Sequence, residues 1–211
     1  MNYLAHLYLA GTTDEALVGN LLGDFVRGTI RVDDWPAEIA RGIQLHRRID
    51  SFTDSHPLVL QSKQRISPER RRVAGIIVDV CYDHFLARHW ERFSDIPLRS
   101  FTSRVYQALQ KHEALLPERL RRMAPRMAAE DWLHSYRDAE TAAFVLERIA
   151  LRLRAPNALA GSGAELMANY EQLEADFLRF FPSAIDYAAA CRLELAAHSQ
   201  RGLKASSAET T

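Results

Sequence analysis

The chain has 211 residues and a mass of 24.0 kDa, which suits one well-buried domain and leaves little room for a second. Basic and acidic residues number 27 each, so the formal charge is zero, which argues against a nucleic-acid binder with a uniformly basic surface. The two cysteines lie far apart and form no redox pair or disulfide framework, and no stretch approaches the roughly 18 apolar residues of a membrane span. We therefore expect a cytoplasmic protein without membrane or nucleic-acid contacts.

The first 27 residues predict two helices. Residues 1–9 are apolar and carry His6, and the break that follows offers Thr12 or Thr13 as the cap of a second helix running to about residue 27.

Two glycines four apart mark the second helix. Gly19 and Gly23 would leave a flat face on which another backbone can approach, with Asp24 beside it. Asp24 is therefore a candidate site residue.

Two further helices are predicted before residue 92. Pro36 is suited to a first helical turn, and the helix that follows should end near Asp54, before the His56–Pro57 turn. Ser67 and Pro68 give the same start signal for a long helix over 68–91.

The second half also reads as helices. Starts are predicted near Pro97, Pro117, Asp138, Ser162 and Ser183. Pro125 is expected to end or kink one helix, Pro182 to interrupt another, and the last to end near residue 198. We find no alternating pattern long enough for a strand, so the prediction is an all-α, single-domain helical bundle over residues 1–200 with a disordered tail over 201–211.

Residues 42–90 hold a density of histidine and aspartate that few helical cores would tolerate. The members are His46, His56, His84, His89, Asp50, Asp54, Asp79 and Asp83. Asp79 lies in the apolar run AGIIVDV, where an unpaired carboxylate would be costly to bury. On a helix, Asp83 would share its face, so the two acids need a cation or an arginine between them.

The same spacing recurs upstream, where His46, Asp50 and Asp54 would form one stripe on a helix. Mixed nitrogen and oxygen ligands suit manganese, iron, zinc or nickel. The plainer interpretation is a surface helix pair, which is common and contributes only about 0.2–0.5 kcal/mol.

Several stretches resemble one family. MNYLAHLYLA, GNLLGDF, GIQLHRRIDSFTDSHP and YDHFLARHW are similar to the bacterial acyl carrier protein phosphodiesterase family, also called acyl carrier protein hydrolase. The resemblance implies an HD-domain-like helical phosphohydrolase that uses Mn²⁺, or Mg²⁺, Fe²⁺ or another divalent ion, to release 4′-phosphopantetheine from holo-acyl carrier protein. The chain lacks the usual His-Asp dipeptide of that superfamily and has the reverse order at Asp83–His84.

This reaction suits the residues, because a metal can neutralise the phosphodiester and lower the pKa of the attacking water. We hypothesise that the ligands are His46, Asp50, Asp83 and His84, with Asp24 bridging from the preceding helix.

Four other side chains receive catalytic hypotheses. Asp79 or Asp54 would orient a ligand histidine or act as the base for water. Arg47 would meet the phosphate, and His6 would be a ligand or a proton donor to the serine oxygen. For Asp79 the competing interpretation is a buried bridge to Arg47 or another arginine.

Two arginine groups can face an acidic carrier protein. The first comprises Arg65, Arg70, Arg71 and Arg72, and the second Arg119, Arg121, Arg122 and Arg126. A solvated helix face is the plainer interpretation of both. We favour the first group for carrier binding because it directly precedes the helix with the candidate ligands.

Two alternative functions remain open. One is an HD-type hydrolase acting on a nucleotide or another small phosphoester, and the other is a non-catalytic helical module that docks on a carrier protein. HExxH, GxSxG, P-loop and Glu-x-x-His motifs are absent, which disfavours zincins, α/β-hydrolases, P-loop enzymes and ferritin-like bundles.

Overall fold

Helices provide all the regular structure in the residues that the computed structural model describes, which are 1–29, 34–153 and 157–208. The prediction of an all-α protein is therefore confirmed. Within these ranges no helix combines the length and the apolar character needed to cross a bilayer.

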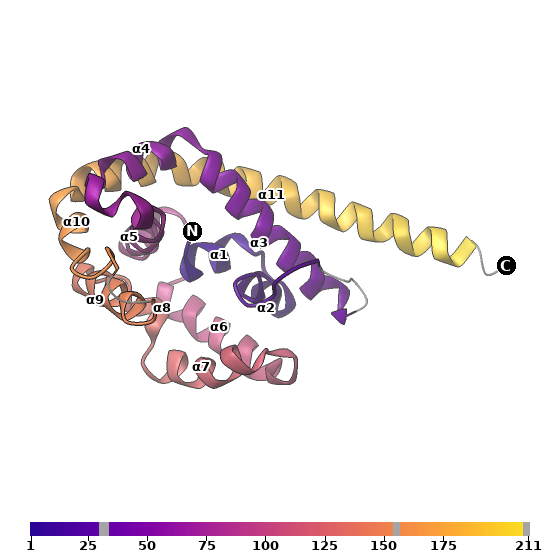
Figure 1. Cartoon of the computed structure of the whole chain (residues 1–211). Coiled ribbons are helices and arrows are strands. Elements are labelled where there is room, and N and C mark those ends of the chain that lie inside the picture. Colours follow the sequence, from indigo (N-terminus) through magenta and orange to yellow (C-terminus); the bar gives the residue numbers. More distant parts are fainter. Residues whose placement is uncertain (30–33, 154–156, 209–211) are drawn as a thin grey trace.

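Four helices build the N-terminal part of the fold (Figure 1): α1 (Tyr3–Leu9), α2 (Asp14–Leu22), α3 (Ala37–Ser55) and α4 (Pro57–Arg65). The hydroxyl oxygen of Thr13 accepts a hydrogen bond from the backbone N–H of Ala16 at 3.1 Å, so the predicted cap of α2 is present. The helix ends at Leu22, earlier than the predicted residue 27.

Glycines let α2 and α3 approach closely, as predicted for Gly19. A Cβ atom on Gly19 would lie 2.4 Å from the carbonyl oxygen of Ile39, and one on Gly42 would lie 2.7 Å from the backbone nitrogen of Asn20. Neither distance is compatible with a side chain, so these glycines set the distance between α2 and α3, the helix that carries His46 and Asp50.

The helix predicted over 68–91 is divided into three parts: the 3-10 segment η2 (Pro68–Val73), the α-helix α5 (Ala74–Arg88) and the 3-10 turn η3 (Trp90–Arg92). The helix type changes after Val73, at the point where the side chains change from exposed to buried. None of η2 is buried, whereas most of α5 is, because it packs against α1, α4, α9, α10 and α11. This buried helix holds α1 in place.

The remaining elements before the C-terminal helix are short or medium in length: α6 (Leu98–Lys111), η4 (Glu113–Leu115), α7 (Glu118–Ala129), α8 (Trp132–Ser135), α9 (Ala139–Ala150) and α10 (Gly163–Ala168). Pro97 and Pro117 directly precede α6 and α7, as predicted. Pro125 lies inside α7 and does not end it.

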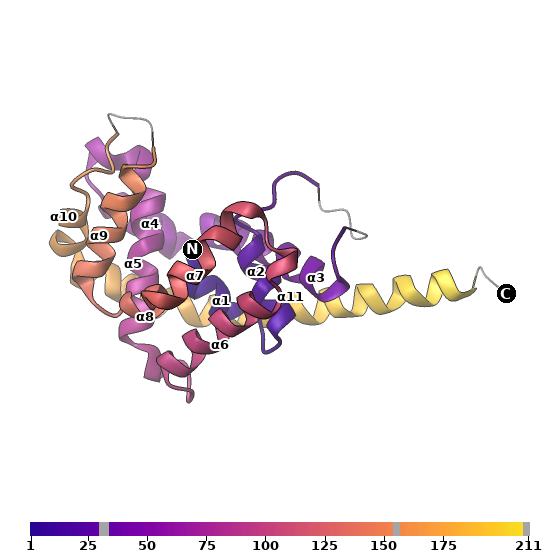
Figure 2. The same cartoon turned by 90° about the horizontal axis from the view of Figure 1, so that it is seen from below.

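The C-terminal helix α11 (Tyr170–Ala208) packs on α3 and α4, and its last part extends away from α9 and α10 (Figure 2). The predicted interruption at Pro182 is wrong, because the helix continues through it. Phe177, Phe180 and Phe181 are fully buried, which anchors the helix around this point. It includes the predicted tail as far as residue 208, and residues 209–211 lie outside the described ranges.

Candidate metal centre

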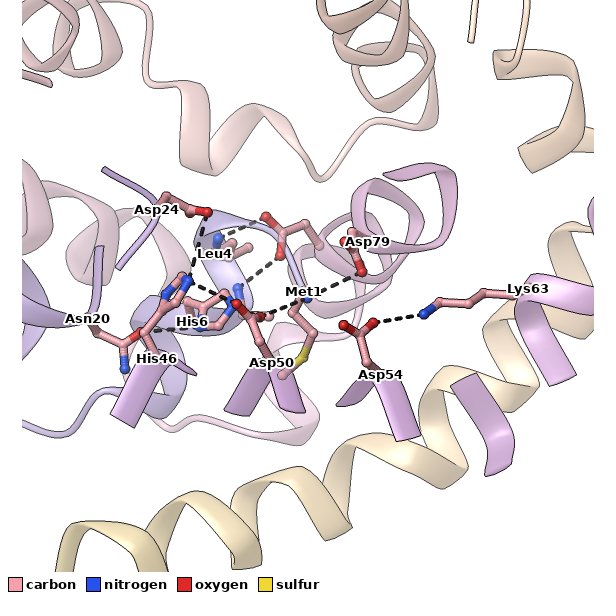
Figure 3. A network of polar contacts seen from close by, with 12 residues as sticks. Met1, Leu4, His6, Asn20, Asp24, His46, Asp50, Asp54, Lys63 and Asp79 are labelled. Carbon is pink, nitrogen blue, oxygen red and sulfur yellow. Dashed lines mark hydrogen bonds and ion pairs between the residues drawn. The ribbon is translucent and has the colours of Figure 1, made fainter. Parts of the chain in front are cut away.

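Three side chains from two helices converge beside α2. His6 comes from α1, and His46 and Asp50 from successive turns of α3, and each offers a ligand atom within 4.8 Å of the others (Figure 3). His46 Nε2 lies 3.1 Å from Asp50 Oδ2, so the predicted i,i+4 pair is present. His6 joins it only through the packing of α1 against the rest of the fold.

The hydrogen bonds of His6 leave its Nε2 atom facing the centre. Its Nδ1 atom lies 3.2 Å from Asn20 Oδ1, so the tautomer that carries the proton on Nδ1 would donate to Asn20 and leave Nε2 free to bind a metal ion. Nε2 then lies 2.9 Å from Asp50 Oδ1. Burial lowers the pKa of His6 to about 4, which disfavours a second proton on the ring. Without a metal ion this contact is a hydrogen bond to Asp50, and a bound cation would take the place of the shared proton.

His46 fits against a glycine and the ring of His6. The two imidazoles stack with centroids 3.8 Å apart and planes 19° apart. A Cβ atom on Gly23 would lie 2.1 Å from His46 Cγ, so the glycine provides the space that the ring occupies. His46 Nε2 also lies 3.8 Å from Asp24 Oδ1.

Carboxylates and one amino group complete the surroundings. Burial alone would raise the pKa of Asp50, but hydrogen bonds with His46 and His6 outweigh it and hold the pKa well below its ordinary value. Burial raises the pKa of Asp24, and the nearby Asp50 adds to the effect. The α-amino group of Met1 lies 3.2 Å from Asp79 and 3.7 Å from Asp50.

The donor set fits a divalent transition metal. Two imidazole nitrogens and one carboxylate are the ligands that such ions take in open catalytic sites. Asp24 lies 3.8 Å from His46 Nε2 but outside this group of three. Asp24 and Asp50 keep 39% and 41% of their side-chain surface exposed, so the centre is open to solvent on one side.

Asp83 lies outside this group of three and has a different contact. Its two oxygens accept hydrogen bonds from the backbone N–H groups of Leu4 and Ala5 at 2.8 and 2.9 Å. These are N–H groups of the first turn of α1, which has no cap from Asn2, so a carboxylate from α5 caps α1 and complements its dipole. Burial raises the pKa of Asp83 to about 7.

His84 also lies outside the group of three and is fully buried. Its Nδ1–H donates to the carbonyl oxygen of Tyr136 at 2.8 Å, and its Nε2 accepts from the hydroxyl of Tyr170 at 2.7 Å. Both ring nitrogens therefore have protein partners. Asp83 and His84 are neighbours in sequence, but their side chains leave α5 in different directions and contact different helices.

The predicted catalytic residues other than His6 have varied contacts. Among the residues that the structure describes, Asp79 pairs with the α-amino group of Met1 and with no arginine, and it lies close to the centre (Figure 3). Asp54 is 73% exposed and pairs with Lys63 at 2.8 Å. Arg47 donates to the carbonyl oxygen of Val26 at 3.0 Å.

Three arginines of the first group bond within the chain. Arg65 pairs with Asp176 at 2.7 Å, Arg70 with Glu165 at 3.3 Å, and Arg71 donates to the carbonyl oxygen of Lys63. Arg72 is exposed. Carrier binding by this group stays a prediction.

One contributor was missed from the sequence. Asn20 fixes the ring of His6, yet it was not singled out. The sequence feature that could have indicated Asn20 is a single amide side chain within the apolar run ALVGNLL. In the structure this side chain is fully buried.

Comparisons with known proteins agree on one family. A family model described as acyl carrier protein phosphodiesterase matches residues 1–184. Proteins named acyl carrier protein phosphodiesterase from Pectobacterium atrosepticum, Serratia proteamaculans and Escherichia coli O6:H1 are 41%, 42% and 40% identical to the chain over 189 residues. Each alignment covers 89% of the chain and 97% of the relative. No solved structure gave a significant match, so the expected likeness to HD domains stays a prediction.

Proposed function

The chain belongs to the acyl carrier protein phosphodiesterase family, and from this premise we propose that it hydrolyses the bond between 4′-phosphopantetheine and the serine of holo-acyl carrier protein at the centre of His6, His46 and Asp50. The products are apo-acyl carrier protein and free 4′-phosphopantetheine. The observation that carries the proposal is the convergence of these three donors on an open face of the protein.

The metal is proposed to be Mn²⁺. Two imidazoles with carboxylates suit a borderline ion better than Ca²⁺, which takes oxygen ligands. When bound, such an ion supplies a Lewis acid for the phosphoryl oxygens and lowers the pKa of a water molecule.

The remaining roles belong to the chain itself. Asn20 holds His6 with Nε2 toward the centre, and Asp83 holds the first turn of α1 and so places His6. Asp24, which faces His46 from the segment after α2, is proposed as the additional ligand. Asp79 is 34% exposed and pairs with the α-amino group of Met1, and it is proposed to accept the proton of the attacking water.

Intact-mass spectrometry of holo-carrier protein tests the proposal. The carrier should lose the phosphopantetheine mass with the wild-type protein and Mn²⁺, and keep it with chelator. Asp50→Asn should abolish the loss, whereas Asp186→Asn, which changes an exposed aspartate on α11, should not.

Two outcomes would count against the proposal. If the carrier mass stays unchanged with every divalent ion, the carrier is not the substrate, and hydrolysis of nucleotides or other small phosphoesters is the next activity to measure. If Asp50→Asn turns over normally, the reaction takes place elsewhere on the protein.

A further inference from the structure

A cavity of about 340 Å³ lies between the first turn of α1 and the helices α7, α8 and α9. Ligand sites commonly have volumes of about 300–1,000 Å³. The catalytic proposal above makes no use of this cavity.

The lining is mostly apolar with a few polar groups. Leu133 and Tyr136 form buried parts of the wall, and Val145 and Phe144 come from α9. Phe144 is 60% exposed, so its ring is accessible to a molecule in the cavity. Such a lining suits a flexible molecule with methylene groups and a small number of amides or hydroxyls.

The cavity and the candidate metal centre each include a residue of α1, and these two residues lie about one turn apart. Tyr3 lines the cavity and precedes His6 by three residues of α1, which is about 4.5 Å along the helix axis. The Tyr3 ring also stacks on the ring of Phe25, with centroids 6.4 Å apart, and Phe25 follows Asp24 in the sequence.

His84 supports the same wall. It binds the carbonyl oxygen of Tyr136 at 2.8 Å, and the Tyr136 hydroxyl accepts a hydrogen bond from the side chain of Asn2 at 2.7 Å. Asn2 and Tyr136 both line the cavity, so a buried histidine and an asparagine fix the cavity wall.

Arginines surround the opening. Arg126, Arg148 and Arg152 line the cavity, and with Arg119 and Arg122 they also line an adjoining open depression. Arg122 pairs with Glu118 on α7, and Arg126 pairs with Glu130, which directly follows α7. Among the residues that the structure describes, the other three arginines have no carboxylate within 4.0 Å, so their charge is available to an acidic partner.

We propose that this cavity binds the pantetheine arm of the carrier protein, together with any acyl chain on its sulfur, while the arginines around the opening face the acidic carrier. The inference rests on the proposed function, because it requires the phosphate at one end of the arm to reach the metal centre. Phosphate, amides and an apolar end follow one another along the arm, in the same order as the metal centre, Tyr3 and the apolar wall lie in the protein.

The direct test is calorimetric titration with lauroyl-pantetheine, which carries the arm and an acyl chain but has no phosphodiester to cleave. Wild-type protein should bind it. Val145→Trp, which fills the cavity, should weaken binding by at least about tenfold, and Phe144→Ala, which removes an exposed wall, should weaken it several-fold. Matched controls are Leu193→Trp and Leu193→Ala, because Leu193 is 75% exposed on α11 and should leave binding unchanged.

Thermal melting establishes that each variant is folded. Because Phe144 is exposed, Phe144→Ala decides the matter if Val145→Trp does not fold. Equal binding by Phe144→Ala and wild type, or no binding of lauroyl-pantetheine to folded wild type, would overturn the inference. These measurements need no turnover, so their failure is distinguishable from a failure to hydrolyse holo-carrier.

The arginines around the opening have their own test. Arg152→Glu should raise KM for holo-carrier by at least about tenfold at low salt and reduce the dependence of KM on salt. The matched control is Arg179→Glu, which reverses the charge of an exposed arginine on α11. Equal KM values for the two variants would contradict this part of the inference.

Discussion

Substitution of Gly23 by alanine tests how the fold makes room for His46. The backbone at Gly23 has φ −51° and ψ −36°, which alanine adopts readily, so any effect must come from contact with the new methyl group. That methyl would lie 2.1 Å from His46 Cγ and 2.4 Å from its Cδ2.

The size of the effect follows from these distances. Carbon atoms in contact lie about 3.5 Å apart, so the ring of His46 must move by about 1.4 Å. Overpacking of this kind costs about 1–3 kcal/mol of stability. A ligand displaced by about 1 Å loses its productive geometry, for which we expect a fall of about 100-fold in Mn²⁺ affinity and in turnover.

The assay is a titration with Mn²⁺ in which electron paramagnetic resonance measures the free ion. Gly75→Ala is the matched control, since the nearest atom to its new methyl would be Lys63 Cε at 3.8 Å. It should bind Mn²⁺ like wild type and gain up to about 1 kcal/mol of stability. Wild-type Mn²⁺ affinity in folded Gly23→Ala would refute the reasoning.

Three further predictions concern stability and reactivity. Arg65→Met should lower the free energy of unfolding by about 3 kcal/mol in urea titrations, because it leaves the buried carboxylate of Asp176 without its charged partner. Burial lowers the pKa of His56 below 6.5, and its Nδ1 caps α4, so its contribution is present above pH 6.5 and is lost as the pH falls through the lowered value. Relative to His56→Asn, wild-type protein with chelator should therefore lose unfolding free energy between about pH 7 and pH 5. Burial raises the pKa of the Cys81 thiol, and both cysteines are buried, so a thiol reagent should label neither until the protein is unfolded.

Each of these has a clear contrary result. Arg72→Met changes an exposed arginine and should alter stability by less than about 0.5 kcal/mol, so equal losses for the two arginine variants would contradict the first. A constant stability difference between wild type and His56→Asn across the pH range would contradict the second. Rapid labelling of Cys81 in folded protein would contradict the third.

Local signals in the sequence predicted the elements and part of the site. Thr13, Pro97 and Pro117 are found at the starts of helices because capping and proline geometry act over a few residues. The pair His46 and Asp50 follows from helical spacing alone.

Features that depend on tertiary contacts were harder to predict from the sequence. His6 reaches the centre through the packing of α1, and the sequence does not specify that packing. Asp83 was expected at the metal, but the uncapped N–H groups of α1 provide a partner that no spacing rule within α5 reveals. Packing against neighbouring helices likewise decides where the helix type changes after Val73 and why α11 continues through Pro182. Such packing can override the local helix propensity of the residues.

The measurement that tests the central claim most directly is an anomalous difference map from crystals soaked in Mn²⁺, recorded at the manganese absorption edge. We predict a peak within coordination distance of His6 Nε2, His46 Nε2 and a carboxylate oxygen of Asp50. A peak elsewhere in the molecule, or no peak at a Mn²⁺ concentration that supports turnover, would contradict the account.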